Sequence, residues 1–284
     1  MRKSFRAGAR AAAGPILGLV LTYVLIALTG WGRHVEALAF AGRQGTGPRV
    51  RAADLLLLET ISTATVLLAL ATLVVVGVLR GRRQLALRTT VAVLGAVISA
   101  EVLKYALPSR NEWSGQWRWL SSGSFPSGHA VIVTSIALAV LSVSPNAWRR
   151  LLVGPLVACT AIATTATVTV GWHRPGDVIG SFFLATAWHR GMTARQRSDH
   201  RRRLTVPTGW TLACWAMAAV LVLGTALDGV LTNLAASGRQ TALSYLAAMV
   251  LLLVGALITV SVPDRPDPRP IPSRPAPVLL EMGA

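Results

Sequence analysis

Two short segments of the chain combine histidine with residues that suit anion binding. The first reads Phe125, Pro126, Ser127, Gly128, His129 and opens an apolar run. Serine is a favoured helix N-cap, glycine lets a ligand approach the backbone, and the free N–H groups at a helix start bind anions such as phosphate. His129 would then lie in the first helical turn, where it could donate a proton. This segment predicts an anion site with an acid beside it.

The second segment runs from Gly171 to Asp177 and contains His173, Arg174 and Pro175. Proline suits the first position of a helix, so His173 would precede that helix and Asp177 would lie in its first turn. Asp177 can then accept a hydrogen bond from one ring nitrogen of His173, which leaves the other nitrogen as a nucleophile or base. Two histidines of this kind suffice for phosphoryl transfer through a covalent intermediate.

Basic residues near these segments are candidates for binding the phosphate. Lys104 and Arg110 follow an earlier apolar run, and Arg174 follows His173 directly. We expect them to hold phosphate oxygens and to offset the charge that develops in the transition state. The simpler alternative is that Lys104 and Arg174 only contact lipid headgroups. Glu101 lies three residues before Lys104 on one helical face and is expected to neutralise it.

The composition places these segments in a membrane. Of the 284 residues, 53% are hydrophobic and only 14% are charged, and the mean hydropathy is +0.55. These values exclude an ordinary soluble domain. The net charge of +17 comes from cations clustered between apolar runs, which predicts contact with lipid headgroups and no nucleic acid partner. Cys159 and Cys214 fall inside apolar runs and are expected to be buried free thiols.

Eight apolar runs approach the length of a membrane helix, which needs about 20 residues. They are residues 12–31, 55–79, 87–107, 128–143, 151–171, 177–188, 208–230 and 243–262. The sixth is too short to cross alone, so it either continues into residues 189–192 or starts below the membrane surface. A cleavable signal peptide is the alternative for the first run, because four cations precede it; its length and the lack of a clear cleavage site favour a retained helix.

The expected fold is therefore all-α, a polytopic membrane helix bundle in which a six-helix core that carries these polar segments is followed by two C-terminal transmembrane helices. Most of the 28 Lys and Arg residues fall on the side of the two termini, which predicts that this side is cytoplasmic. The polar segments then share the extracytoplasmic face of the plasma (inner) membrane. The expected units are a basic N-terminus (1–11), a catalytic membrane domain (12–190), a basic linker (191–207), a two-helix membrane extension (208–262) and a Pro-rich disordered cytoplasmic tail (263–284).

Taken together, the polar segments resemble the type 2 phosphatidic acid phosphatase superfamily. This family includes lipid phosphate phosphatases, undecaprenyl diphosphate phosphatases and vanadium haloperoxidases. Its signature has a Lys followed by Arg-Pro, then Pro-Ser-Gly-His, then Ser-Arg followed by a His with an Asp four residues on. The second motif matches fully at residues 126–129, and His173 and Asp177 have the spacing of the third. The resemblance covers roughly residues 55–188.

Two positions depart from the family pattern. The spacing from Lys104 to Arg110 is one residue shorter than usual, and no proline follows Arg110. The arginine of the third motif, expected six residues before the histidine, falls on Thr167. Loss of a bidentate guanidinium could remove about 1.5 to 3 kcal/mol of phosphate binding. Arg174, on the other side of His173, is the candidate substitute.

The resemblance implies roles for the matched residues. His173 would attack phosphorus and form a phosphohistidine, with Asp177 orienting it, and His129 would protonate the leaving oxygen and then help to activate water. The residues implied to bind the phosphate oxygens are Lys104, Arg110, Ser127 and the Gly128 N–H. The resemblance implies neither a cofactor nor a metal. The acidic residues near this face are scattered rather than clustered, which also argues against a two-metal carboxylate site.

These observations predict a metal-independent membrane enzyme that hydrolyses a phosphate monoester or diphosphate of a polyprenyl lipid or a glycerolipid at the outer leaflet. The Arg- and Ala-rich composition is typical of a high-GC bacterium, which slightly favours polyprenyl carriers of cell envelope synthesis. The alternative from another class, motivated by Thr167, is a degenerate member that binds lipid phosphate or acts as a scaffold. A transporter has less support, because the polar residues gather at one face rather than at midmembrane. The sequence leaves the exact lipid and the oligomeric state open.

Overall fold

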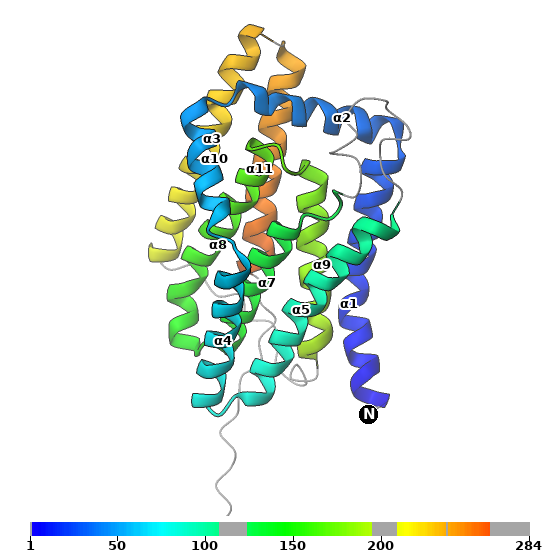
Figure 1. Ribbon diagram of the computed structural model, residues 1–284, viewed down its shortest axis with the longest axis vertical. Coiled ribbons are helices and arrows are strands. Elements are labelled where there is room, and N and C mark those ends of the chain that lie inside the picture. The colour runs from blue at the N-terminus through cyan, green and yellow to red at the C-terminus, as the bar shows by residue number, and fades with distance from the viewer. Residues whose placement is uncertain (1, 108–123, 195–208, 237, 262–284) are drawn as a thin grey trace, which may run out of the picture.

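The computed structural model describes residues 2–107, 124–194, 209–236 and 238–261, and this part of the chain is helical without a β-strand (Figure 1). The first half contains α1 (Arg2–Thr22), a π-helical turn η1 (Tyr23–Leu28), α2 (Gly30–Ala41), a 3-10 turn η2 (Gly42–Gly45), α3 (Pro48–Glu59), α4 (Thr63–Leu79) and α5 (Arg83–Ala106). The second half contains α7 (Gly128–Val143), α8 (Asn146–Thr169), α9 (Pro175–Thr193), α10 (Gly209–Ala236) and α11 (Arg239–Ser261). The described residues of all eight apolar runs are therefore mainly helical, although the first run is divided among α1, η1 and α2 and the second between α3 and α4.

The helices form one bundle around a shared hydrophobic core. α9 packs against α1, α5 and α7, while α8 packs against α7, α10 and α11. The largest buried cluster joins Val168 of α8 and Phe182 of α9 to Val222 of α10 and to Tyr245 and Met249 of α11. The two C-terminal helices are thus part of the same packed bundle as the motif-bearing helices.

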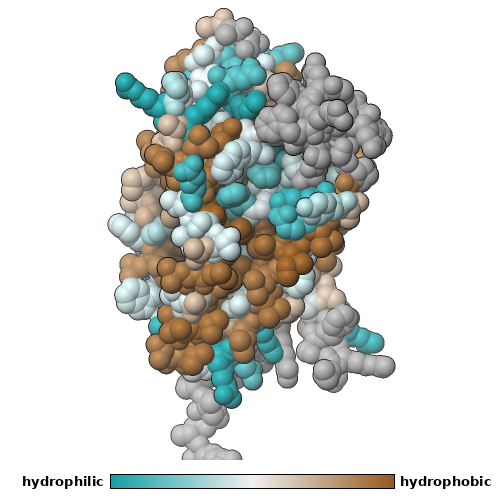
Figure 2. All heavy atoms as spheres, in the orientation of Figure 1, coloured by the Kyte–Doolittle hydropathy of each residue, from teal (hydrophilic) through white to brown (hydrophobic). Residues whose placement is uncertain are grey.

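The outside of the bundle is apolar over most of its length. Leu17, Leu68 and Val220 are 58%, 67% and 70% exposed, and Figure 2 shows a wide hydrophobic zone with hydrophilic residues towards the two ends. Among the described residues, five helices are long and apolar enough to cross a membrane, and a sixth span results if α3 and α4, which meet at a bend of 53°, count as one. The chain is a polytopic helical membrane protein.

The two shorter runs are enclosed by the bundle. α7 has 16 residues, and α9 extends from Pro175 to Thr193, so the sixth run does continue past residue 188. Ser142 and His189 are buried and bonded to each other, with Oγ and Nε2 3.1 Å apart. Because neighbouring helices cover α9 and satisfy its polar groups, this helix needs no uniformly apolar surface.

The segment after the first run differs from a simple loop. The first helix ends before residue 31, since Thr29 caps α2 by accepting the N–H of Gly32 on its Oγ1 at 3.0 Å. α2 then lies across the end of the bundle opposite the N-terminus, and η2 leads on to α3 (Figure 1). Trp31, assigned to the first membrane run, is 75% exposed in α2.

The two cysteines are free, as predicted, but only Cys214 is buried. The expectation that Cys159 is buried is wrong. Cys159 faces the apolar pocket between α4, α7 and α8 that also contains Ile132 and Leu156. An apolar run in a membrane helix indicates contact with lipid or with protein and does not distinguish the two.

Candidate active site

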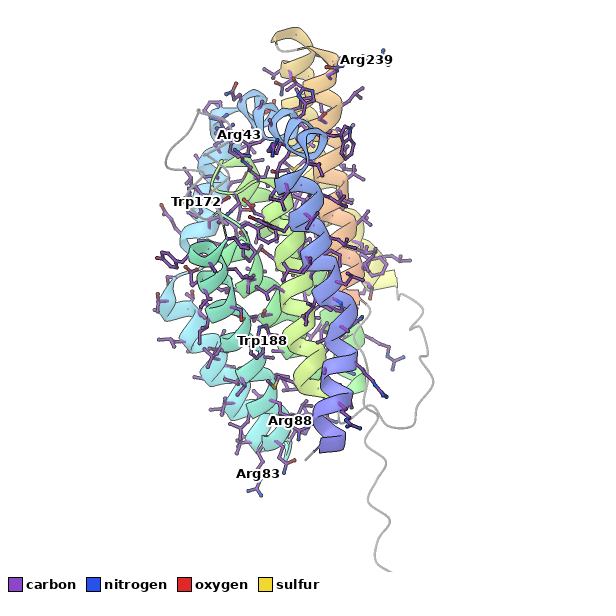
Figure 3. All side chains as sticks on the ribbon, turned by 90° about the vertical axis from the view of Figure 1, so that its right-hand side faces the viewer. Arg43, Arg83, Arg88, Trp172, Trp188 and Arg239 are labelled. Carbon is purple, nitrogen blue, oxygen red and sulfur yellow. The ribbon has the colours of Figure 1, made fainter. Side chains whose placement is uncertain are left out.

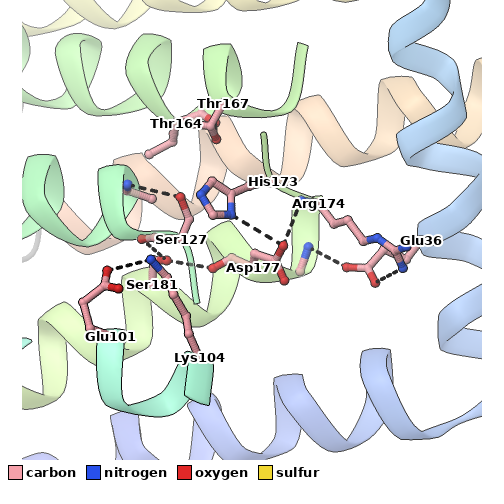
Figure 4. Close-up of polar contacts among 12 residues, drawn as sticks. Glu36, Glu101, Lys104, Ser127, Thr164, Thr167, His173, Arg174, Asp177 and Ser181 are labelled. Atoms are coloured by element: carbon pink, nitrogen blue, oxygen red, sulfur yellow. Dashed lines mark hydrogen bonds and ion pairs between the residues drawn. The ribbon is translucent and has the colours of Figure 1, made fainter. Parts of the chain in front are cut away.

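The Pro-Ser-Gly-His segment is fixed to the first turn of α9. Ser127 caps α7, and its Oγ accepts the Ala130 N–H at 3.4 Å. The N–H of Ser127 donates to the carbonyl of Asp177 at 3.1 Å. The hydroxyl of Ser181 lies 2.9 Å from the Ser127 carbonyl oxygen and 2.7 Å from that of Asp177. The start of α7 and the start of α9 are therefore held side by side (Figure 4).

The turn that carries His173 is shaped by the end of α8. The N–H groups of Trp172 and His173 donate to the carbonyl oxygen of Thr167 at 3.0 and 3.1 Å. Gly171 has a φ of +89°, a left-handed conformation that favours glycine. Pro175 begins α9 at the position predicted from the sequence. Local backbone bonds thus set the position of His173 without help from its side chain.

His173 and Asp177 face each other at a distance slightly longer than a hydrogen bond. Nδ1 of His173 lies 3.7 Å from Oδ2 of Asp177, and this carboxylate is completely buried. The same Oδ2 accepts the N–H of Arg174 at 3.0 Å. The predicted hydrogen bond to His173 is therefore not formed, although Nδ1 is buried and has no hydrogen-bond partner among the described residues. Such contacts commonly tighten when substrate binds.

His129 lies in the first turn of α7 and is half-buried. Its ring lies against that of Trp172, with centroids 5.1 Å apart and planes tilted by 50°. The imidazole is also within electrostatic range of His173 and Lys104. The start of α7 and the turn before α9 thus bring the two candidate histidines near each other.

Lys104 reaches this site from the end of α5. Its Nζ lies 2.6 Å from Oε1 of Glu101, which is the neutralising pair expected from their spacing. A Cβ added to Gly128 would lie 3.3 Å from Nζ of Lys104. A side chain at position 128 would therefore narrow the space between the ammonium group and the start of α7. Lys104 and the N-terminal amides of α7 can therefore contact the same anion.

Of the two predicted arginines, only Arg174 lies within the described residues, and it turns to a different partner. Arg110 lies outside the described residues. Arg174 extends to α2, where its Nη1 is 3.8 Å from Oε2 of Glu36 (Figure 4). Oε1 of the same glutamate accepts the Gly176 N–H at 3.1 Å. Thr167, at the position of the family arginine, is completely buried, and its Oγ1 donates to the Thr164 carbonyl at 2.7 Å.

Sequence reasoning missed Glu36 and Arg43. Glu36 is a buried residue of α2, and the Nε of Arg43 lies 2.6 Å from the place that a Cβ on Gly171 would occupy. Burial lowers the pKa of Arg43, and the charges of Arg51 and Arg174 lower it further. The sequence feature that could have indicated these two residues is a single glutamate among several arginines between the first two apolar runs.

The gathered groups are those needed for phosphoryl transfer. They comprise an imidazole beside a buried carboxylate, a second imidazole, an ammonium group and free amides at a helix start. Within the described ranges no three His, Cys, Asp or Glu side chains gather in a group that could hold a metal ion.

Comparison with known proteins agrees with this chemistry. A family model described as the PAP2 superfamily matches residues 85–201. This match begins in α5 and contains Lys104, residues 126–129, His173 and Asp177. Comparisons with curated proteins and with solved structures gave no match. Residues 85–201 are thus similar to the PAP2 superfamily, whose members are generally phosphatases that act on phosphate esters.

Proposed function

We propose that this protein is an integral membrane phosphatase that hydrolyses a phosphate monoester or diphosphate of a membrane lipid, of the polyprenyl or glycerolipid type. The observation that carries this proposal is that His129, His173 and Lys104 lie near one another at the start of α7. Asp177 lies beside His173. Phosphoryl transfer depends mainly on positioning and on stabilisation of the phosphoryl oxygens, and these residues offer both.

The proposed reaction has two steps and needs no metal. An imidazole nitrogen of His173 attacks phosphorus, the bond to the leaving oxygen breaks, and His129 gives that oxygen a proton. Water then attacks the phosphohistidine, His129 accepts the proton of the water, and the phosphorus–nitrogen bond breaks to release phosphate. The Asp177 carboxylate offsets the positive charge on His173 in the first step. Lys104 and the N-terminal amides of α7 bind the phosphoryl oxygens.

A pocket near the site supports a substrate with an apolar tail. It has a volume of about 260 Å³, lies between α4, α7 and α8, and is lined mainly by apolar side chains. Ile132 and Val133 in its wall follow His129 by three and four residues, so they lie on the same face of α7 one turn further along. A lipid chain in this pocket would place its phosphate near His129.

We propose further that the site faces the extracytoplasmic side of a bacterial plasma membrane. The start of α9, which belongs to the proposed site, lies towards the end of the bundle opposite the N-terminus (Figure 1). Most cations of the chain fall on the side of the N-terminus, which by the positive-inside rule is the cytoplasmic side.

The test is phosphate release from a panel of lipid monophosphates and diphosphates by the purified protein in detergent with EDTA. His173→Ala and His129→Ala should each abolish release, while the matched variant His34→Ala, which changes a histidine of α2 away from the site, should retain it. Loss of release in EDTA, with recovery on adding a divalent metal, would contradict the metal-free reaction. Lipid binding without release by the wild type would favour the alternative of a degenerate, lipid-phosphate-binding member, for which Thr167 is the reason.

A further inference from the structure

Two arginines lie near one aromatic ring close to the turn that carries His173, and a third bonds to the backbone of one of them. The guanidinium carbon of Arg43 lies 3.9 Å from the centre of the Phe40 ring, and that of Arg174 lies 5.8 Å from it. Nη2 of Arg51 donates to the backbone carbonyl of Arg43 at 2.8 Å. These arginines come from η2, α3 and the turn before α9, and we call them the arginine cluster.

The charges of the arginine cluster are poorly compensated. Arg174 has Glu36 at 3.8 Å, but Arg43 donates only to the Phe40 carbonyl, at 3.0 Å. In the described ranges neither Arg43 nor Arg51 has a carboxylate partner. The Nε groups of Arg51 and Arg174 are buried and have no hydrogen-bond acceptor there. Buried N–H groups and adjacent like charges are both costly, and an anion would offset both.

The cluster lies directly against the catalytic turn. Arg174 follows His173 in sequence, and Arg43 packs on Gly171 so closely that a Cβ there would clash with its guanidinium. Figure 3 shows Arg43 near Trp172 at the same end of the bundle. Thr167 of α8 contributes no cation to this turn, because its side chain is a neutral hydroxyl, which bonds within its own helix. The arginine cluster is therefore a source of positive charge for the outward side of the turn.

The two C-terminal helices hold the backbone that carries Arg43. Nδ2 of Asn233 donates to the Gly42 carbonyl at 2.6 Å, and Asp228 accepts the Gly47 N–H at 2.7 Å. The hydroxyl groups of Thr46 and Tyr245 are 3.1 Å apart. Residues 42–47 are thus fixed at several points, and the position of Arg43 does not depend on local helix geometry alone.

We propose that Arg43, Arg51 and Arg174 form a phosphate-binding subsite on the outward side of the 171–174 turn. Guanidinium groups bind phosphate oxygens in pairs, and the unbonded Nε groups supply donors that no atom of the described residues uses. The phosphate group has two possible sources, the reacting phosphate of the substrate or inorganic phosphate, which is the product. Phosphate binding by the arginine cluster can be tested without the proposed function, and only the effect of this binding on turnover rests on that function.

The first arm of the test measures binding without catalysis. Inorganic phosphate should raise the Tm of the detergent-purified wild type and of Arg49→Ala, the matched control at an exposed position of α3. Arg43→Gln and Arg51→Gln should lose this stabilisation while they keep the wild-type helical circular dichroism. If either glutamine variant fails to fold, Arg43→Lys and Arg51→Lys replace them and should show weakened stabilisation. Undiminished stabilisation of the Arg43 and Arg51 variants would overturn the subsite.

The second arm distinguishes the two sources of phosphate. If the cluster binds the reacting phosphate, Arg43→Gln should lower kcat/KM for a lipid phosphate by about 10- to 100-fold, the range for a lost charged hydrogen bond, and Arg49→Ala should stay near wild type. If it binds only the product, KM should remain unchanged and product inhibition by inorganic phosphate should weaken. Failure of the proposed function would give a different result. The wild type would then show no turnover, while inorganic phosphate would still raise its Tm in a way that depends on Arg43.

Discussion

Oδ2 of Asp177 accepts the backbone N–H of Arg174 at 3.0 Å while lying 3.7 Å from Nδ1 of His173. One carboxylate oxygen therefore serves both as the cap of α9 and as the neighbour of the proposed nucleophile. The cap fixes the carboxylate before substrate arrives, so only a small movement of His173 is needed to form the hydrogen bond. Preorganised charge of this kind stabilises an imidazolium without reorganisation during the reaction.

The two roles of Asp177 can be separated by Asp177→Asn. The amide oxygen can still accept the Arg174 N–H, so the variant should keep its fold, but it no longer offsets charge on His173. We expect kcat to fall by roughly 10²- to 10⁴-fold, the usual contribution of an acid–base group. The measurement is kcat for a lipid phosphate, with the Tm as the control for folding. Full activity in the Asp177→Asn variant would reduce Asp177 to a helix cap.

His129→Ala should allow the covalent intermediate to be trapped. A substrate with a good leaving group, such as p-nitrophenyl phosphate, needs no proton from His129 in the first step, whereas water attack in the second step still needs a base. We expect a burst of p-nitrophenol followed by slow turnover, and a phosphate on His173 that mass spectrometry detects in protein kept at alkaline pH.

The controls for this trapping experiment are the variants His173→Ala and His34→Ala. The first should give neither burst nor phosphorylated peptide, because the proposed nucleophile is missing. The second should turn over like the wild type, because His34 lies on α2, outside the group of residues proposed to react. Phosphate found on a residue other than His173 would contradict the proposed nucleophile.

Lys104 should matter for the phosphate and not for membrane anchoring. Its Nζ lies near the open space at Gly128, and Lys104→Met removes the charge while keeping an apolar side chain of similar length. We expect kcat/KM to fall by about 10- to 100-fold, as for a lost charged hydrogen bond. The control is Arg83→Met, a change at the opposite end of the same helix (Figure 3). Equal losses in both variants would indicate a general effect of helix-end cations.

The helices and the main site residues could be predicted from the sequence because they depend on local patterns. An apolar run of sufficient length predicts a membrane helix, and the spacing of His173, Pro175 and Asp177 predicts the start of one helix. The position of Arg43 depends on contacts with Gly171 and with residues 228–245, which are far away in the sequence. The local sequence of residues 30–51 does not indicate which distant residues it will contact. The position of α2 and the arginine cluster could therefore not be predicted from that sequence.

Asn233 tests whether the C-terminal helices position the arginine cluster. The side chain is only 2% exposed, and its Nδ2 lies 2.6 Å from the carbonyl oxygens of both Gly42 and Gly229. Asn233→Ala removes the link between α10 and η2. Side-chain hydrogen bonds between membrane helices contribute about 0.6 kcal/mol on average and up to about 1.7 kcal/mol, so the fold should survive with a slightly lower free energy of unfolding.

The informative result for Asn233→Ala is its effect on phosphate. If Asn233 only stabilised the bundle, phosphate would raise the Tm of the variant as much as that of the wild type. Because Gly42 precedes Arg43 directly, we expect a smaller increase and a weaker apparent affinity for phosphate. Thr232→Ala is the matched control, since Thr232 is exposed on the same helix and donates to the Asp228 carbonyl within that helix. Equal phosphate responses in both variants would show that residues 42–47 keep their position without this link.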